Sequence, residues 1–290
     1  MLAESGAVPV TVANDMVSEI VVTGQRREQS TLAHSGSIEL LDGALMDDVL
    51  HQHAHQLLTR VAGAWISRGS GQEHLTAIRS PVLTGPGSCG AFLFLENGVP
   101  IRPAGFCNVN QLFEIDTEQA QSIEVIRGPG NALYGSNALH GTVNVLMPMQ
   151  GNRSAAHGIV EVGANRFLRL QAELPANPQS AHFAGFSFID DGGFRDDSGY
   201  RQFKLHANTT GEFLGGELTS AFSATDLDQE TAGFIVGEDA YRDLAVNRSN
   251  PNPEAFREAS SQRLYGIWSK PVSRYALDVR PFLRHTDMRF

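Results

Sequence analysis

The chain has 290 residues, enough for one or two domains with a sizeable core, and its formal net charge is −10 at pH 7. Nucleic acid requires a concentrated basic surface, and no Lys/Arg-rich run is present, so we expect no nucleic-acid partner. No run of about 18 apolar residues occurs, which argues against a transmembrane helix but not against spanning strands, since these are about 10 residues long and alternate in polarity.

The first half of the chain predicts a mixture of short helices and strands. Residues 1–18 lack the basic start and apolar centre of a secretory signal, so we expect either that a signal has been removed or that the sequence is incomplete. Residues 42–61 have apolar side chains at helical spacing, with Asp42 as a candidate N-cap and Gly63 at the end. Strand-like runs follow at residues 64–68, 75–79, 92–95, 123–127 and 142–146, and a turn or short helix at 118–122. This mixture predicts an α+β domain.

After Pro148 the pattern changes to strands alone. We expect seven, at residues 158–165, 167–174, 182–190, 201–210, 217–225, 263–270 and 275–284. Connections 165–166 and 271–274 are tight, whereas 225–261 is long and polar. Polar and apolar side chains alternate within the strands; one face of residues 201–209 carries Phe203, Leu205 and Ala207, and the other Gln202, Lys204, His206 and Asn208. Such alternation fits a soluble sandwich with its polar face outside, or a membrane barrel with its apolar face outside.

Residues 123–148 are the most informative segment, because two β-branched strands flank a Gly-rich connection. The order Ile-Glu-Val-Ile-Arg-Gly-Pro, Leu-Tyr-Gly, Val-Asn-Val resembles the signature that closes the plug domain of TonB-dependent outer-membrane receptors. The resemblance continues upstream in the family's order, at residues 19–24, 48–50, 61–63, 69–79 and 93–100. Three places depart from the family's turn residues, at Ser80-Pro81, Glu96-Asn97 and Leu139-His140.

This resemblance implies an α+β plug domain followed by antiparallel strands of a transmembrane β-barrel. We divide the chain into an N-terminal extension with the start of the plug (1–36), the plug (37–150) and barrel strands (155–290). Outer-membrane transporters have about 22 strands, and about seven cannot close around a plug. We therefore expect an incomplete barrel, from a fragment or a truncated gene product. The implied location is the outer membrane of a Gram-negative-type cell, with the plug facing the periplasm.

The implied function is energy-coupled uptake of a scarce solute such as a ferric siderophore, cobalamin or a glycan. The implied partners are the energising protein TonB, outer-membrane lipid and a small-molecule ligand such as a metal chelate. The alternative is a plug-type ligand-binding or signalling module without transport. We expect no enzyme and no cofactor: residues 128–135 lack the Lys-Ser/Thr of a phosphate loop, and no Gly-x-Ser-x-Gly elbow occurs.

The candidate coupling segment resembles the box that pairs with TonB; it consists of Glu19, Ile20, Val21, Val22 and Thr23. The mechanism would be β-augmentation, in which an extended strand adds to the edge of the partner's sheet. The alternative is an ordinary first strand of the plug, with the coupling box elsewhere, for example within residues 8–13.

Two further groups of residues are implied by the resemblance. Arg79 and Arg127, with Glu124, resemble the group that pairs with acidic residues on the barrel wall; the alternative is a salt bridge inside the plug. Loops 83–91 and 101–109 are implied to face the extracellular vestibule, where Arg102, Phe106 and Asn108 would contact the ligand. The alternative is that these loops are only structural.

Cys89 and Cys107 lie in these same two loops. An even count of cysteines in an exported protein favours a disulfide, which would tie the loops together and lower the ordering cost of binding. The alternative is two free thiols.

His51, His53 and His55 raise the possibility of a metal site, since His51 and His55 would share a helix face with Asp47 or Asp48. No third strong ligand is evident in the sequence. We therefore expect a solvated polar helix face and no metal.

Overall fold

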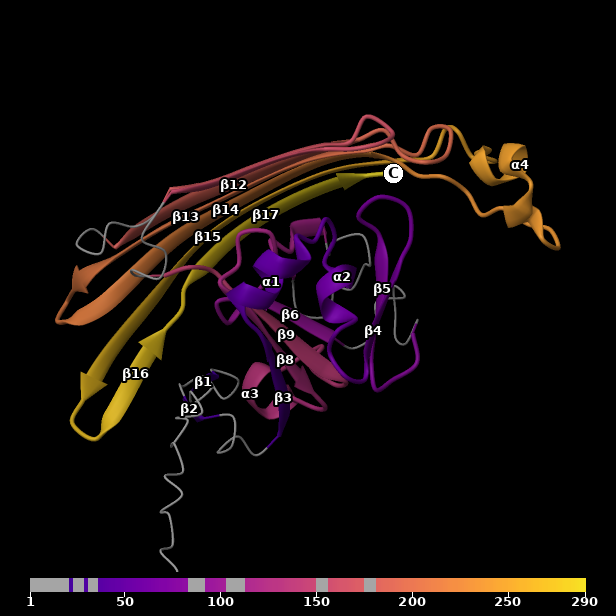
Figure 1. Ribbon diagram of the computed structural model, residues 1–290. Coiled ribbons are helices and arrows are strands. Elements are labelled where there is room, and N and C mark those ends of the chain that lie inside the picture. Colours follow the sequence, from indigo (N-terminus) through magenta and orange to yellow (C-terminus); the bar gives the residue numbers. More distant parts are fainter. Residues whose placement is uncertain are drawn as a thin grey trace, which may run out of the picture.

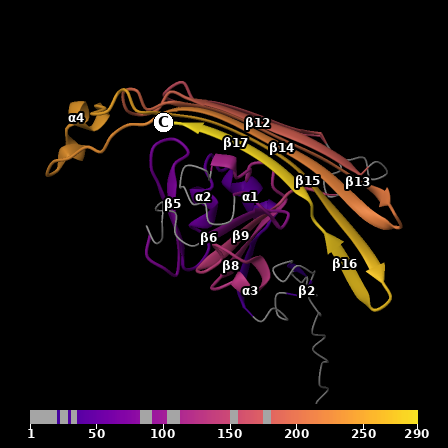
Figure 2. The same cartoon turned by 180° about the vertical axis from the view of Figure 1, so that it is seen from behind.

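The computed structural model describes residues 21–22, 29–30, 36–82, 92–102, 113–149, 156–174 and 181–290. We call the described residues between 36 and 149 the plug, and those between 156 and 290 the wall. The wall is one long curved sheet that arches over one side of the plug (Figure 1). The view from behind shows the same arrangement (Figure 2).

The plug is built on a five-stranded sheet in which only β6 and β9 run parallel. In spatial order its strands are β3 (Ser37–Leu41), β8 (Ser122–Arg127), β9 (Gly141–Leu146), β6 (Phe92–Glu96) and β7 (Val99–Pro100). A separate hairpin consists of β4 (Ala64–Arg68) and β5 (His74–Ile78), and a short helix, α3 (Asn131–Tyr134), follows β8. Near the N-terminus β1 (Val21–Val22) pairs with β2 (Gln29–Ser30). The predicted strands of this domain are confirmed to within one or two residues.

The predicted single helix over residues 42–61 is wrong, because two short helices occupy this segment. These are α1 (Gly43–Val49) and α2 (His55–Leu58). The cap was predicted correctly, since Asp42 Oδ1 accepts the N–H of Leu45 at 2.9 Å. Leu50 has a left-handed φ of 45°, which ends α1 and turns the chain. Both helices still bury apolar side chains against the sheet, among them Met46 and Leu57.

The wall contains eight antiparallel strands in the described part of the chain. They are β10 (His157–Val162), β11 (Leu168–Leu174), β12 (His182–Asp191), β13 (Tyr200–Phe213), β14 (Gly216–Glu230), β15 (Phe256–Val272), β16 (Tyr275–Val279) and β17 (Phe282–Arg289). Each strand pairs with the next, except that β16 and β17 both pair with β15. The predicted strand 275–284 is interrupted because Pro281 has no N–H to donate to the ladder.

The two faces of the wall have the polarity expected of a barrel and not of a soluble sandwich. Polar side chains on the concave face are buried against the plug, and they include Arg169, Gln202, Lys204, His206, Asn208 and Arg263. Apolar side chains on the convex face are exposed, including Val160, Phe186, Phe203, Phe222, Leu264 and Leu283. Successive side chains of a strand point to opposite faces, so an alternating sequence gives a polar face toward the plug and an apolar face on the outside. The predicted α+β plug followed by antiparallel strands of an incomplete barrel is thus confirmed, and the sheet is open.

The long polar connection is shorter than predicted, because β14 continues beyond residue 225 and β15 begins before residue 261. Residues 231–255 remain, with a short 3₁₀ helix, η4 (Ala240–Arg242), and α4 (Leu244–Arg248). In the added part of β14 the outward-facing residues Asp226 and Asp228 are polar. The apolar outward face that predicted the other strands is therefore missing here. α4 projects beyond one end of the wall, and β16 lies at the other end (Figure 2). Within the described residues no helix is long and apolar enough to cross a membrane.

Candidate solute site and plug–wall interface

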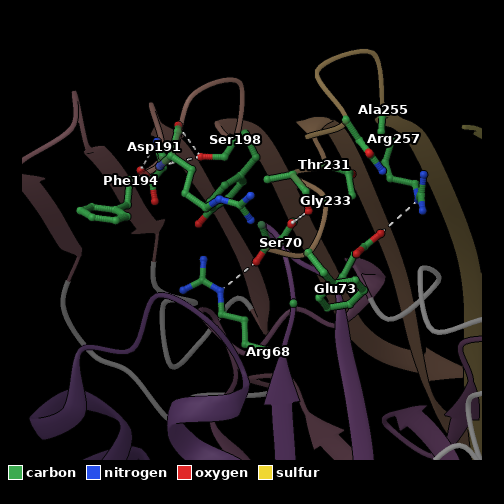
Figure 3. A pocket seen from close by; sticks show the side chains of 18 of the residues that line it. Arg68, Ser70, Glu73, Asp191, Phe194, Ser198, Thr231, Gly233, Ala255 and Arg257 are labelled. Atoms are coloured by element: carbon green, nitrogen blue, oxygen red, sulfur yellow. Dashed lines mark hydrogen bonds and ion pairs between the residues drawn. The ribbon is translucent and has the colours of Figure 1, made fainter. Parts of the chain in front are cut away.

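A cavity of about 760 Å³ lies where the connection between β4 and β5 meets the loops at the α4 end of the wall (Figure 3). This volume is in the usual range for small-molecule sites. The plug contributes Arg68, Gly69, Ser70, Gly71 and Glu73, and the wall contributes Asn165, Asp191, Gly193, Phe194, Arg195, Ser198, Tyr200, Thr231, Ala232, Gly233, Phe234, Asn252, Ala255 and Arg257.

Backbone geometry and one wall glutamine fix the plug side of the cavity. Gly71 has a φ of +50°, a conformation that favours glycine, and a Cβ there would meet the Gln229 side chain. Gln229 Oε1 accepts the N–H of Gln72 at 2.7 Å, and its amide donates to Ser70 O at 3.2 Å. The turn is therefore held against the wall by hydrogen bonds to its backbone, which leaves its side chains available to the cavity.

Three arginines and two carboxylates line the cavity. Glu73 Oε1 lies 3.1 Å from Arg257 Nε, and burial raises the pKa of Glu73 although Arg257 opposes the shift. Asp191 Oδ1 accepts the N–H of Gly193 at 2.9 Å. Arg68 donates from Nε to Gly71 O at 2.9 Å, and Arg195 to Ser249 O. The cavity thus has an excess of cationic side chains in a chain with a net negative charge.

Aromatic side chains supply the apolar part of the cavity. Phe234 is 95% exposed, and Phe194 is half exposed beneath the guanidinium of Arg248, 5.3 Å from the ring centroid. Tyr200 is buried at the start of β13. Exposed aromatic rings beside cationic groups provide both contact area and directional hydrogen bonds for a solute.

Below the cavity, buried ion pairs join the plug to the wall. Glu96 of β6 lies 2.6 Å from Arg263 of β15 and accepts a 2.6 Å hydrogen bond from Ser223. Burial by itself would raise the pKa of Glu96, but Arg263 and His206 outweigh it and the pKa is lowered. Arg263 also reaches Glu114 at 3.5 Å, where burial dominates and the pKa is raised. One wall arginine thus holds two plug carboxylates.

A second buried ion pair involves β13, which β14 separates from the β15 strand of Arg263. Lys204 Nζ of β13 contacts both oxygens of Glu118, at 2.9 and 2.8 Å, and donates to Ile115 O at 2.6 Å. Lys204 overcomes the effect of burial and lowers the pKa of Glu118. Asp116 is also buried, and its pKa is raised well above the usual value by burial and by the charge of Glu118. The lysine therefore lowers the pKa of one buried carboxylate, beside a second whose pKa burial raises.

The sequence did not identify these residues as an interface, although its alternation did indicate the polar face on the wall side. The alternation that placed Lys204 and His206 on a polar face is confirmed, and that face is buried against the plug. The plug carboxylates Glu96, Glu114 and Glu118 carry no local pattern that marks them as partners. Only the tertiary structure brings them to the wall.

The expected polarity of the interface was the reverse of the observed one in these contacts, where the plug supplies carboxylates and the wall supplies cations. Arg127 instead pairs inside the plug, with Glu39 at 3.0 Å and with Ala62 O at 2.7 Å. Glu124 is buried in the plug sheet and accepts from Asn144 at 3.2 Å. Arg79 is exposed, and its backbone N–H donates to Gly63 O. The Arg127–Glu39 pair corresponds to the alternative of a salt bridge inside the plug.

The predicted ligand residues are only partly described. Arg102 is 1% exposed and donates to the carbonyl of Phe92, a structural position that does not match the expectation of ligand contact. Burial lowers the pKa of Arg102 to about 10. Phe106, Asn108 and the two cysteines Cys89 and Cys107 lie outside the described residues, as do Glu19, Ile20 and Thr23. Val21 and Val22 form β1, whose backbone pairs with Gln29 and Ser30.

The expectation of a solvated histidine face is wrong, because His51 and His53 are buried. His51 Nε2 lies 2.9 Å from Thr117 Oγ1, and burial lowers the pKa of His51 to about 4. The ring of His53 packs 5.0 Å from that of His55 and 5.1 Å from that of His74. The break at Leu50 removes the shared helix face. No group of three or more potential metal ligands is found among the described residues.

Comparisons with known proteins agree with this architecture. The family model described as TonB-dependent Receptor Plug Domain matches residues 30–142. The vitamin B12 transporter BtuB of Vibrio vulnificus (strain CMCP6) is 28% identical over 206 residues, which cover 71% of this chain and 32% of that protein. The chain therefore spans about a third of the length of this relative.

Two solved structures show the same fold. The ferric citrate transporter FecA in its unliganded form superposes with a TM-score of 0.73 at 15% identity, covering 92% of this chain and 42% of that one. The ferric yersiniabactin uptake receptor FyuA from Yersinia pestis gives a TM-score of 0.67 at 16% identity, covering 88% and 42%. With residues 30–142 matching the plug domain of TonB-dependent receptors and a wall of the same topology as these structures, this chain has the fold of that part of these receptors.

Proposed function

We propose that this chain forms the plug and part of the wall of an outer-membrane receptor for the energy-coupled uptake of a scarce solute. The observation that carries the proposal is the cavity shared by the plug turn 68–73 and the wall loops. A solute bound there contacts both parts, so a movement of the plug changes the walls of its own binding site. The exposed apolar convex face is the surface that meets outer-membrane lipid.

The relatives offer two classes of solute. BtuB is named as a vitamin B12 transporter, whereas FecA and FyuA are named for ferric citrate and ferric yersiniabactin. The experiment is to delete the gene that encodes this chain from its host and to measure uptake of radiolabelled cobalamin and of a panel of ferric chelates. Loss of uptake of one solute, restored by the gene on a plasmid, supports transport. Unchanged uptake of every solute contradicts it.

We propose further that residues 19–23 bind TonB as an added strand, with the plug facing the periplasm. The pairing of Val21 and Val22 with Ser30 and Gln29 supports this, since the segment adopts extended backbone. Val22→Pro removes an N–H donor and fixes φ, so it should abolish uptake and leave solute binding at the cell surface intact. Val22→Ala is the matched control and should transport normally. Normal transport by the proline variant would place the coupling box elsewhere, for example within residues 8–13.

A second candidate is a ligand-binding or signalling module without transport. The cavity shared by the plug and the wall supports it, since that cavity can bind a solute whether or not transport follows. The same experiment separates the two candidates: solute binding without uptake in the complemented strain identifies the module.

A further inference from the structure

Three histidine rings form a cluster inside the plug, beside the turn at residues 68–73. The cluster consists of His53, His55 and His74, and the exposed fractions of His53 and His74 are only 1% and 3%. The centroid of the His53 ring lies 5.0 Å from that of His55 and 5.1 Å from that of His74. Buried imidazoles in contact with one another are titratable groups that neither the cavity nor the plug–wall ion pairs use.

The hydrogen bonds of the cluster fix the two buried rings in their neutral form. His53 Nε2 and His74 Nδ1 lie 3.4 and 3.3 Å from one acceptor, the carbonyl oxygen of Gln72, so both nitrogens donate. The other nitrogen of each ring has no acceptor for a second proton. His53 Nδ1 already accepts the backbone N–H of His55 at 3.0 Å, and His74 Nε2 is buried without a hydrogen-bond partner among the described residues.

The charges around the cluster also oppose its protonation. Apart from the rings themselves, the charged groups that act most strongly on it are Arg68 of β4, on His53 and His55, and Lys204 of β13, on His74. Both are cations. Burial, reinforced by these charges, lowers the pKa of His53 strongly and that of His74 to about 4.

Gln72 links this cluster to the wall. Its carbonyl accepts from the two buried rings, and its own N–H donates to Gln229 Oε1 of β14 at 2.7 Å. The amide of Gln229 donates in turn to Ser70 O at 3.2 Å. A proton added to either ring disturbs its contact with Gln72, and a displacement of Gln72 breaks the hydrogen bonds that hold the turn to the wall.

We propose that the histidine cluster is an acid-sensitive switch, which keeps the turn at residues 68–73 against the wall while the rings are neutral and releases it when they take up protons. Because this turn forms the plug side of the cavity, its release opens the contact between plug and wall at that place. The inference goes beyond the proposed uptake function, since it assigns a response to pH that does not depend on which solute the cavity binds.

The direction of the pH dependence follows from linkage. The buried rings are neutral in the closed turn and gain access to protons in the released one, so the closed turn loses stability as the pH falls below the ordinary histidine pKa of 6.5. Each ring shifts the equilibrium up to about tenfold per pH unit, down to its pKa in the closed turn. Glu73 acts in the opposite direction, because burial raises its pKa and favours its protonated form in the closed turn.

The test is hydrogen–deuterium exchange of the full chain in detergent, expressed as protection factors so that the intrinsic effect of pH on exchange is removed. Two buried histidines acting together should lower the protection of residues 69–76 about tenfold or more between pH 7.5 and pH 5. The paired strands β8 and β9 belong to the same plug and should keep their protection.

A double variant removes the titration and keeps the donors. In His53→Gln and His74→Asn the side-chain amide nitrogens take the approximate positions of His53 Nε2 and His74 Nδ1, so each can still donate to Gln72 O. This double variant should keep the turn protected at pH 5. The matched control is His285→Gln, which replaces an exposed histidine of the wall and should show the same acid response as the wild type.

Two results would overturn the inference: protection of the turn that stays constant down to pH 5 in the wild type, or an equal loss in the double variant. If the double variant does not fold, a carbon-13 NMR titration of the histidine rings in the wild type decides. Buried rings that stay neutral until the turn loses its protection support the switch. Rings that all titrate near pH 6.5 while the turn remains protected contradict it.

Discussion

The buried pair between Lys204 and Glu118 gives the sharpest test of how the plug is held. Lys204→Met keeps the length of the side chain and removes its charge. Glu118, whose side chain is 2% exposed, then loses the ammonium group 2.8 Å away, the main contact that offsets the cost of burying its carboxylate. Removing one partner of a buried ion pair costs about 3–5 kcal/mol, because the other charge stays buried without compensation.

This cost should appear as a lower melting temperature of the chain refolded in detergent, followed by circular dichroism. For a domain of about 150–250 residues, 1 kcal/mol corresponds to about 2–4 °C, so Lys204→Met should melt roughly 10 °C lower than the wild type. The matched control is Arg201→Met on the same strand. Arg201 lies 3.9 Å from Asp190, and both are exposed, so its loss should cost at most about 1 kcal/mol.

The double variant Glu118→Gln, Lys204→Met completes the cycle. Glu118→Gln alone leaves the ammonium group without its counter-charge and should also destabilise the chain. The double variant buries no unpaired charge, so we expect it to recover most of the loss and to melt above both single variants. A melting temperature for Lys204→Met within about 2 °C of the wild type, or losses that simply add in the double variant, would refute the reasoning.

Three smaller effects are expected in the same assay. Asp116→Asn should raise the melting temperature at neutral pH, because burial raises the pKa of Asp116. In the wild type, the stability that Asp116 contributes is present below its ordinary pKa of 3.8 and is lost as the pH rises through the raised pKa. The gain in melting temperature from Asp116→Asn should therefore shrink toward pH 3.8. An equal gain at every pH would contradict this. Arg127→Met should cost only about 1 kcal/mol, since its pair with Glu39 is partly exposed, and it should leave the protease resistance of the plug–wall interface unchanged. Gly98→Ala should lower the melting temperature by several degrees, because Gly98 has a φ of +75° and an added methyl group would meet Arg280; an unchanged value would show that the turn rearranges freely.

The histidine segment shows where periodicity in a sequence misleads. The spacing of apolar residues over 42–61 fits one helix equally well as two short ones. A sequence pattern does not predict the left-handed conformation of Leu50, since most non-glycine residues avoid it. Because the chain turns at this point, His51 and His53 point into the plug, and the solvated face expected of a continuous helix does not exist.

The sequence by itself determined the plug and its strands, since β-branched runs, the Gly-rich connection and the ordered motifs are local signals. It also determined which face of each wall strand is polar, because alternation with a period of two is read directly from the chain. That period alone places Phe203 and Lys204 on opposite faces, and the structure shows that the Lys204 face is the buried one.

The tertiary structure alone decided which groups meet. Lys204 and Glu118 are 86 residues apart, and the cavity combines the turn at 68–73 with wall loops from 165 to 257. No local pattern encodes such pairs, because they depend on how the curved sheet lies against the plug. Burial then gives the contacts their energy: a carboxylate in water gains little from a nearby lysine, whereas one excluded from water requires it.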